Sequence, residues 1–96
     1  MLESALQRRF LKWLTEQGIY FVKVVAATRD GVLDVQACVS GCFVSIELKR
    51  DAAKIPTPLQ FYNGRKVEAS GGVFLVCNPD TIAEVKKRIL QIKGGP

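Results

Sequence analysis

The stretch from Gly31 to Lys49, GVLDVQACVSGCFVSIELK, decides how this chain folds. It contains two apolar runs, Val32–Val39 and Cys42–Leu48, separated by the dipeptide Ser40-Gly41. Runs rich in β-branched residues favour strands, and a two-residue break that ends in glycine is typical of a tight hairpin. The stretch therefore predicts two antiparallel strands joined at residues 40–41.

Three charged residues stand out within this predicted hairpin. Asp34 interrupts the first apolar run, where a charge is costly, and Glu47 and Lys49 flank Leu48 at the end of the second. Residues two apart point to the same side of a strand, and pairing across the hairpin places Asp34 opposite Glu47. Two carboxylates that close repel each other unless a cation lies between them. The pattern thus favours a divalent metal site over a chance ion pair at a sheet edge.

Such a trio has a chemical purpose in phosphodiester hydrolysis. Carboxylate oxygens hold Mg²⁺, which takes its remaining ligands from water and from substrate phosphate. The ion lowers the pKa of a bound water and polarises the phosphoryl oxygen, and a nearby ammonium offsets the negative charge that develops. Asp34, Glu47 and Lys49 are therefore predicted to be the centre of a nuclease active site.

The rest of the chain predicts further helices and strands around this hairpin. Apolar periodicity and helix caps predict helices at residues 2–17, 58–70 and from Asn78-Pro79 to about Gln91. Two more β-rich runs predict strands at 19–25 and 73–77. The order helix, three strands, helix, strand, helix predicts an α/β fold with a mixed sheet flanked by helices. We expect residues 1–92 to be a single domain and residues 93–96 to be a C-terminal tail.

Composition narrows the classes of function. A net charge of +5 with a pI near 9.4 favours a polyanionic partner such as DNA. The chain has no histidine, which excludes the usual zinc ligand sets and Ser–His or Cys–His catalysis. Its three cysteines lie in apolar runs and are expected to be buried, reduced thiols. We expect no signal peptide, no membrane association, no small-molecule cofactor and a cytoplasmic location, which is the host cytoplasm if the source is viral.

Two segments of the hairpin also resemble a known family. Gly31-Val32-Leu33-Asp34 and Ile46-Glu47-Leu48-Lys49 resemble the two halves of the PD-(D/E)XK nuclease signature. Together with Thr57-Pro58-Leu59-Gln60 and the run 71–76, they make the chain similar to the virus-type replication–repair nuclease (VRR-NUC) group over about residues 3–90. The family usually has proline before the aspartate, where this chain has Leu33. That departure predicts an altered strand geometry rather than lost activity.

The resemblance implies a restriction-endonuclease-like core and a structure-selective DNA endonuclease of the kind found in phages and in DNA repair. It also implies dependence on Mg²⁺, for which Mn²⁺ would substitute, branched substrates such as four-way (Holliday) junctions, and a homodimer. Gln60 would join the catalytic residues, and Glu3 would join Asp34 and Glu47 as a metal ligand. The alternatives are a solvated Gln60 and a Glu3 that only complements the helix dipole.

Basic residues surround the predicted site. As a set they favour contacts with the DNA backbone, although each one alone is as well explained as part of a solvated face. They are Arg8, Arg9, Lys12, Arg50, Lys54, Arg65 and Lys66. The alternative function is a catalytically silent nucleic-acid-binding module on a nuclease-like fold. The third hypothesis is a small structural or interaction protein in which the acidic pair is accidental.

Overall fold

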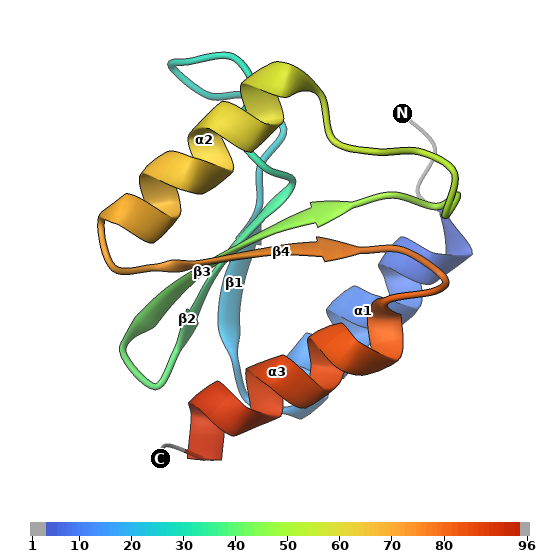
Figure 1. Cartoon of the computed structure of the whole chain (residues 1–96). Coiled ribbons are helices and arrows are strands. Elements are labelled where there is room, and N and C mark those ends of the chain that lie inside the picture. The colour runs from blue at the N-terminus through green and yellow to red at the C-terminus, as the bar shows by residue number, and fades with distance from the viewer. Residues whose placement is uncertain (1–3, 95–96) are drawn as a thin grey trace.

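A four-stranded mixed sheet lies at the centre of the computed structural model, which describes residues 4–94 (Figure 1). The element order is the one the sequence predicts, so the predicted α/β fold class is confirmed. The elements are α1 (Ala5–Glu16), β1 (Tyr20–Lys23), β2 (Val35–Val39), β3 (Cys42–Leu48), α2 (Pro58–Ala69), β4 (Val73–Cys77) and α3 (Ile82–Gly94).

The strands lie in the order β1-β2-β3-β4, with the first three antiparallel and β4 parallel to β3. Ser40 and Gly41 both have positive φ, 49° and 80°, as a two-residue hairpin turn requires. The turn fixes the register at Val35 opposite Ile46, the register that the sequence predicts. Parallel pairing of β3 with β4 requires a crossover, and α2 supplies it.

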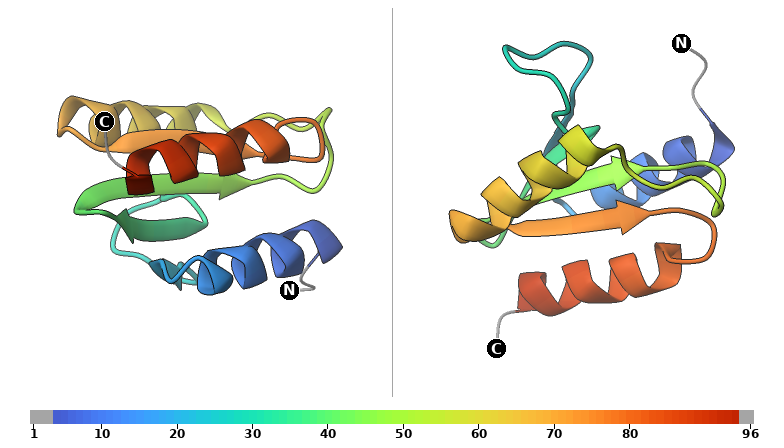
Figure 2. Two further views of the ribbon diagram at one scale, coloured as in Figure 1. Left: turned by 90° about the horizontal axis from the view of Figure 1, so that it is seen from below. Right: turned by 45° about the horizontal axis from the view of Figure 1, so that its top comes forward.

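Helices cover the two faces of the sheet unequally (Figure 2). On one face, α1 and α3 bury a core in which Phe10 and Ile89 are fully inaccessible to solvent. On the other face, α2 packs over β4, where the ring of Phe61 meets that of Phe74 edge-on with centroids 6.0 Å apart. A Cβ on Gly64 would lie 2.6 Å from the Phe74 ring, so glycine lets α2 approach the sheet closely.

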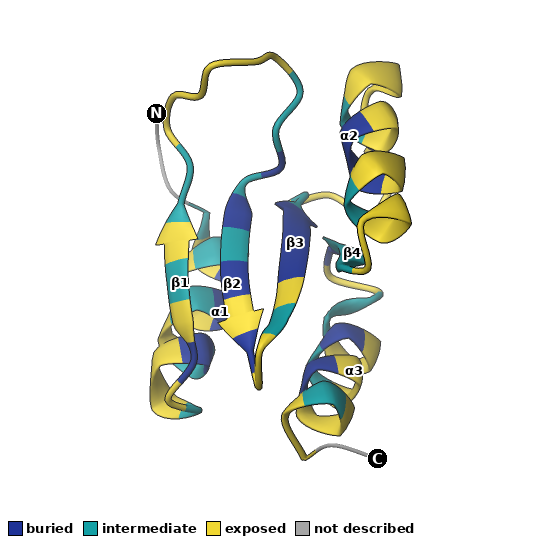
Figure 3. Cartoon of the chain, turned by 90° about the vertical axis from the view of Figure 1, so that its left-hand side faces the viewer, coloured by how far each residue is buried: buried dark blue, intermediate teal, exposed yellow. Residues whose placement is uncertain are grey.

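Part of the α2 face of the sheet is left uncovered (Figure 3). Tyr20, Cys38 and Phe43 pair in one row across β1, β2 and β3 and therefore point to the same side. Tyr20 is 73% exposed and Phe43 is 50% exposed. Cys38 is exposed as well, so the expectation that all three thiols are buried was wrong; Cys77 alone is fully buried.

Several element boundaries differ from the predicted ones. β2 begins at Val35, so Asp34 lies directly before the strand rather than inside it. The chain turns at Gly31, whose φ is +78°, and the preceding loop is held to α2 because the Asn63 amide donates to the carbonyl of Asp30 at 3.0 Å. At the other end, α3 continues through Lys93 to Gly94.

The end of α3 contacts the turn between β2 and β3. The Ser40 hydroxyl donates a hydrogen bond to the Lys93 carbonyl at 2.8 Å, which satisfies one of the carbonyls left free at a helix end.

Among residues 4–94, no helix is long and apolar enough to cross a membrane.

Candidate active site

Three of the four predicted catalytic residues, Asp34, Glu47 and Lys49, lie together at one end of the sheet, where the parallel strands β3 and β4 finish. The first turns of α1 and α3 lie at the same end of the molecule (Figure 1). In open α/β sheets, ligand sites form beyond the carboxyl ends of the strands, and helix N-termini favour anions there. This end of the fold is therefore suited to a phosphate-bearing ligand.

Backbone hydrogen bonds hold Asp34 and Lys49 in place. One oxygen of the Asp34 carboxylate, Oδ2, accepts from the Leu48 amide at 2.9 Å, and the Asp34 carbonyl accepts from the Val24 amide at 2.7 Å. The Lys49 amide donates to the Cys77 carbonyl at 2.9 Å, which continues the β3–β4 pairing beyond the strand. Asp34 is thus fixed beside the end of β3 even though it precedes β2.

Glu47 lies at the centre of this group and is almost completely buried. Its side chain is 3% exposed, and the Lys49 ammonium lies 3.2 Å from its Oε2. Burial, and then the charge of Asp34, raise the pKa of Glu47 to about 7, although Lys49 acts to lower it. The other carboxylate oxygen, Oε1, is buried without a hydrogen-bond partner. A buried oxygen of this kind is costly unless a further group binds it.

This arrangement fits a hard divalent cation. Asp34 and Glu47 offer oxygen ligands, and one of those oxygens has no partner within the described part of the chain. No cluster of three or more acidic, cysteine or histidine ligands occurs among residues 4–94. Mg²⁺ is usually held by one or two carboxylates together with waters and substrate phosphate, so two carboxylates are a sufficient protein contribution. The predicted third ligand, Glu3, lies outside the described residues.

A cavity of about 540 Å³ opens onto the acidic pair, and we call it the acidic cavity. Two of its lining residues, Ser4 and Gln7, come from the start of α1 and were not predicted. Ser4 caps α1 by accepting from the Gln7 amide at 3.1 Å, and the side-chain nitrogen of Gln7 is buried without a partner. The sequence contains the capping pattern Ser-x-x-Gln at this helix start. The position of the helix start beside Glu47, however, depends on tertiary packing. The full lining is Ser4, Gln7, Asp34, Glu47, Leu48, Lys49, Arg50, Lys54 and Ile55.

Gln60, predicted to be catalytic, has a structural contact of its own. Its side-chain oxygen accepts from the Thr57 amide at 2.9 Å, and its own amide donates to the Thr57 hydroxyl at 3.1 Å. The two residues form a capping box at the start of α2. Gln60 is not among the residues that line the acidic cavity, so its catalytic role stays a prediction.

Replacing Gln60 by alanine should therefore reduce stability. We expect the free energy of unfolding to fall by about 1 kcal/mol, because the Thr57 amide loses its acceptor at the helix start. Urea denaturation at a fixed pH measures this change. Gln91→Ala, an exposed glutamine in α3, is the control. If Gln60→Ala were as stable as the wild type, the capping role would be wrong.

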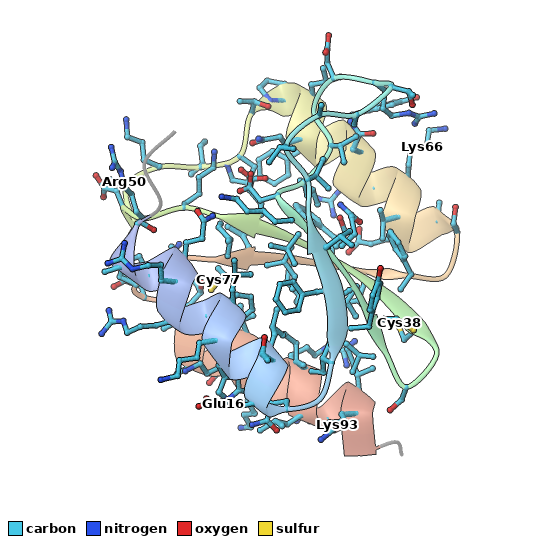
Figure 4. The ribbon with its side chains drawn as sticks, turned by 180° about the vertical axis from the view of Figure 1, so that it is seen from behind. Glu16, Cys38, Arg50, Lys66, Cys77 and Lys93 are labelled. Atoms are coloured by element: carbon cyan, nitrogen blue, oxygen red, sulfur yellow. The ribbon has the colours of Figure 1, made fainter. Side chains whose placement is uncertain are left out.

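The predicted basic residues separate into different groups. Arg50 and Lys54 line the acidic cavity, whereas Arg65 pairs with Glu68 at 3.1 Å on the outer side of α2. Lys66 lies over the ring of Tyr62, 5.5 Å from its centroid. Figure 4 shows Arg50 and Lys66 far apart, at opposite ends of the molecule. Arg8, Arg9 and Lys12 are exposed along α1.

Comparison with known proteins supports the fold. No known protein family matches this sequence, and no curated protein matches it either. A solved structure described as a VRR_NUC domain protein superposes with a TM-score of 0.64, covering 95% of this chain and 93% of that one. The two sequences are 14% identical, so the likeness concerns the fold. The chain has a VRR_NUC-like core of three helices and a four-stranded mixed sheet.

Proposed function

We propose that this protein is a metal-dependent nuclease that hydrolyses DNA phosphodiester bonds. The observation that carries the proposal is the cluster of Asp34, Glu47 and Lys49 at the end of the parallel strands, with a buried Glu47 oxygen that lacks a partner. A structural role alone gives no reason to bury the Glu47 carboxylate beside a second, half-buried carboxylate, that of Asp34. The VRR_NUC-like fold and the positive net charge agree with a nucleic-acid substrate.

Each residue has a task in this proposal. Asp34 and Glu47 would hold Mg²⁺, or Mn²⁺ in its place, which would supply a water of lowered pKa and a polarised phosphoryl oxygen. The Lys49 side chain, which lines the acidic cavity and is 20% exposed, would donate hydrogen bonds to the reacting phosphate and offset its growing negative charge. The buried position of Glu47 excludes bulk water and strengthens these interactions.

A cleavage panel tests the proposal. Supercoiled plasmid, linear duplex, single strand, flap and four-way junction are each incubated with Mg²⁺, Mn²⁺, Ca²⁺ or EDTA. We expect cleavage with Mg²⁺ and Mn²⁺ and none with EDTA. Salt-sensitive DNA binding without any cleavage would contradict the proposal and favour the catalytically silent module.

Within this function we propose branched DNA as the substrate and a homodimer as the active form. One small domain offers one acidic cavity, whereas a two-fold dimer would offer two for paired cuts across a four-way junction. The uncovered part of the sheet supports a dimer, because it exposes Tyr20, Val22 and Phe43 in neighbouring rows. Phe61 and Tyr62 add exposed aromatic surface on α2.

Light scattering at micromolar concentration should therefore report about twice the chain mass of 10.6 kDa. Phe43→Glu should shift the mass to that of one chain, because a charge would be buried in the interface. Leu90→Glu is the control, since Leu90 is 45% exposed but lies on α3, on the other side of the sheet. A wild-type monomer, or equal cleavage of linear duplex and junction, would contradict the dimeric form and leave the nuclease proposal standing.

A further inference from the structure

A second cavity, of about 510 Å³, adjoins the acidic cavity, and its charged lining residues are all cationic. The two cavities share Ser4 and Arg50 in their linings. Arg9 from α1 and Lys86 from α3 complete a set of three cationic side chains around the second cavity, and none of the acidic residues between positions 4 and 94 lines it. Ala5, Leu6, Pro79 and Ile82 form the remainder of its wall. We call it the basic cavity.

The positive charge of this cavity is not neutralised within the described part of the protein. The two ion pairs found among residues 4–94 join Lys49 to Glu47 and Arg65 to Glu68. Neither involves Arg9, Arg50 or Lys86. The cavity also lies between the first turn of α1 and the start of α3, where the helix dipoles add partial positive charge. An anion is the ligand that this field favours.

We propose that the basic cavity binds a phosphate group of the strand being cut, next to the phosphodiester at the acidic pair. Two guanidinium groups and one ammonium match the oxygens of a phosphate, since arginine donates in a fork and lysine acts as a point charge. Arg50 borders both cavities, so a strand that leaves Asp34 and Glu47 along this side meets Arg9 and Lys86 next. This inference rests on the proposed function for its substrate.

The position of the basic cavity also indicates along which side of the molecule the bound strand leaves the acidic pair. The basic cavity lies on the α1 and α3 side of the molecule, whereas Arg65 and Lys66 lie on α2. A phosphate held between α1 and α3 therefore fixes where the cut strand leaves the acidic pair. Lys86, which was not among the predicted DNA contacts, becomes a positioning residue for that strand.

The protein contains its own reporter for this cavity. Trp13 is the sole tryptophan of the chain, and the Lys86 ammonium lies 5.5 Å from the centroid of its ring. A phosphate that draws the ammonium away from the indole changes the charge beside the ring. Occupation of the cavity should therefore change the tryptophan emission.

Tryptophan emission during titration tests the inference. The metal-free protein, in EDTA at low salt, is titrated first with inorganic phosphate and separately with a short single-stranded oligodeoxynucleotide. We expect a saturable change in both titrations. Arg9→Ala should weaken each by about tenfold, as expected for the loss of a charge-assisted hydrogen bond. Lys87→Ala, an exposed lysine beside Lys86 that does not line the cavity, should change either by less than about twofold.

Two outcomes would overturn the inference. Equal affinities of Arg9→Ala and Lys87→Ala for both ligands would mean that the cavity is not the binding site. A response to inorganic phosphate without one to the oligonucleotide would mean that the ligand is free phosphate rather than a strand. Calorimetry of Lys86→Ala against Lys87→Ala repeats the comparison without relying on Trp13. Since no arm requires cleavage, failure of the nuclease proposal is recognised separately, in the cleavage panel.

Discussion

Replacing Glu47 by glutamine is expected to slow metal-dependent cleavage by about three orders of magnitude or more, which corresponds to roughly 4 kcal/mol of lost transition-state stabilisation. Glutamine keeps the shape of the side chain but removes the charge that would hold the cation. Single-turnover cleavage of the best substrate from the panel, at saturating Mg²⁺, measures the change. Asp34→Asn should behave in the same way.

The same substitution should make the metal-free protein more stable at neutral and alkaline pH. The pKa of Glu47 is raised from its ordinary 4.5 to about 7 in the fold, so the unfolded chain loses the proton first as pH rises. Stability therefore falls between about pH 4.5 and pH 7 and stays lower above that range. The fall amounts to roughly 3 kcal/mol at most, and Glu47→Gln should lack it.

Thermal unfolding in EDTA at pH 5 and pH 8 tests this pH dependence. Glu16→Gln, an exposed glutamate at the end of α1, is the matched control and should follow the wild type in both stability and cleavage. A Glu47→Gln variant that cleaves near the wild-type rate would show that Glu47 holds no catalytic metal. A variant less stable than the wild type at pH 8 would show that the buried charge does not strain the fold.

Lys49→Met should separate catalysis from binding. We expect the cleavage rate to fall by about a hundredfold or more, because methionine has no ammonium to stabilise the negative charge on the reacting phosphate. DNA affinity in Ca²⁺ should change by less than about threefold. Since Lys49 lowers the pKa of Glu47, its removal should also shift the acidic limb of the pH–rate profile to higher pH.

Arg65→Ala is the comparison for this variant. Arg65 lies on the outer side of α2 and is paired with Glu68, so we expect modestly weaker binding with a flatter salt dependence and little change in the chemical step. Filter binding over a range of salt and single-turnover rates measure both properties. Equal losses of binding and cleavage in Lys49→Met and Arg65→Ala would mean that the reacting phosphate lies elsewhere.

The sequence was most informative where the structure is local. The turn at Ser40-Gly41 fixes the register of its own strands, which is why the placement of Asp34 beside the end of β3 was predictable. The cap of α2 was equally readable, because Thr57 and Gln60 lie one helical turn apart. That local pattern accounts for the observed contact of Gln60 without any catalytic task.

Features that depend on how distant elements pack could not be predicted. Gln7 reaches the acidic cavity, and Lys86 the basic one, only because α1 and α3 lie together on one face of the sheet. Apolar periodicity predicts that these helices are amphipathic, but it does not predict which end of the sheet their first turns approach. The exposure of Cys38 was missed for the same reason, since an apolar strand does not reveal that α2 covers only part of its face.

The hairpin that joins β2 to β3 also has a consequence for the order of folding. Asp34 and Leu48 meet across 14 positions of sequence, whereas the β3–β4 pairing must wait for the α2 crossover. Hairpins close within microseconds, and contacts between distant segments form later. The two carboxylates are therefore brought together early, before α1 and α3 supply most of the core. Their repulsion is therefore already present in the transition state of folding, and a divalent cation should speed folding more than it slows unfolding.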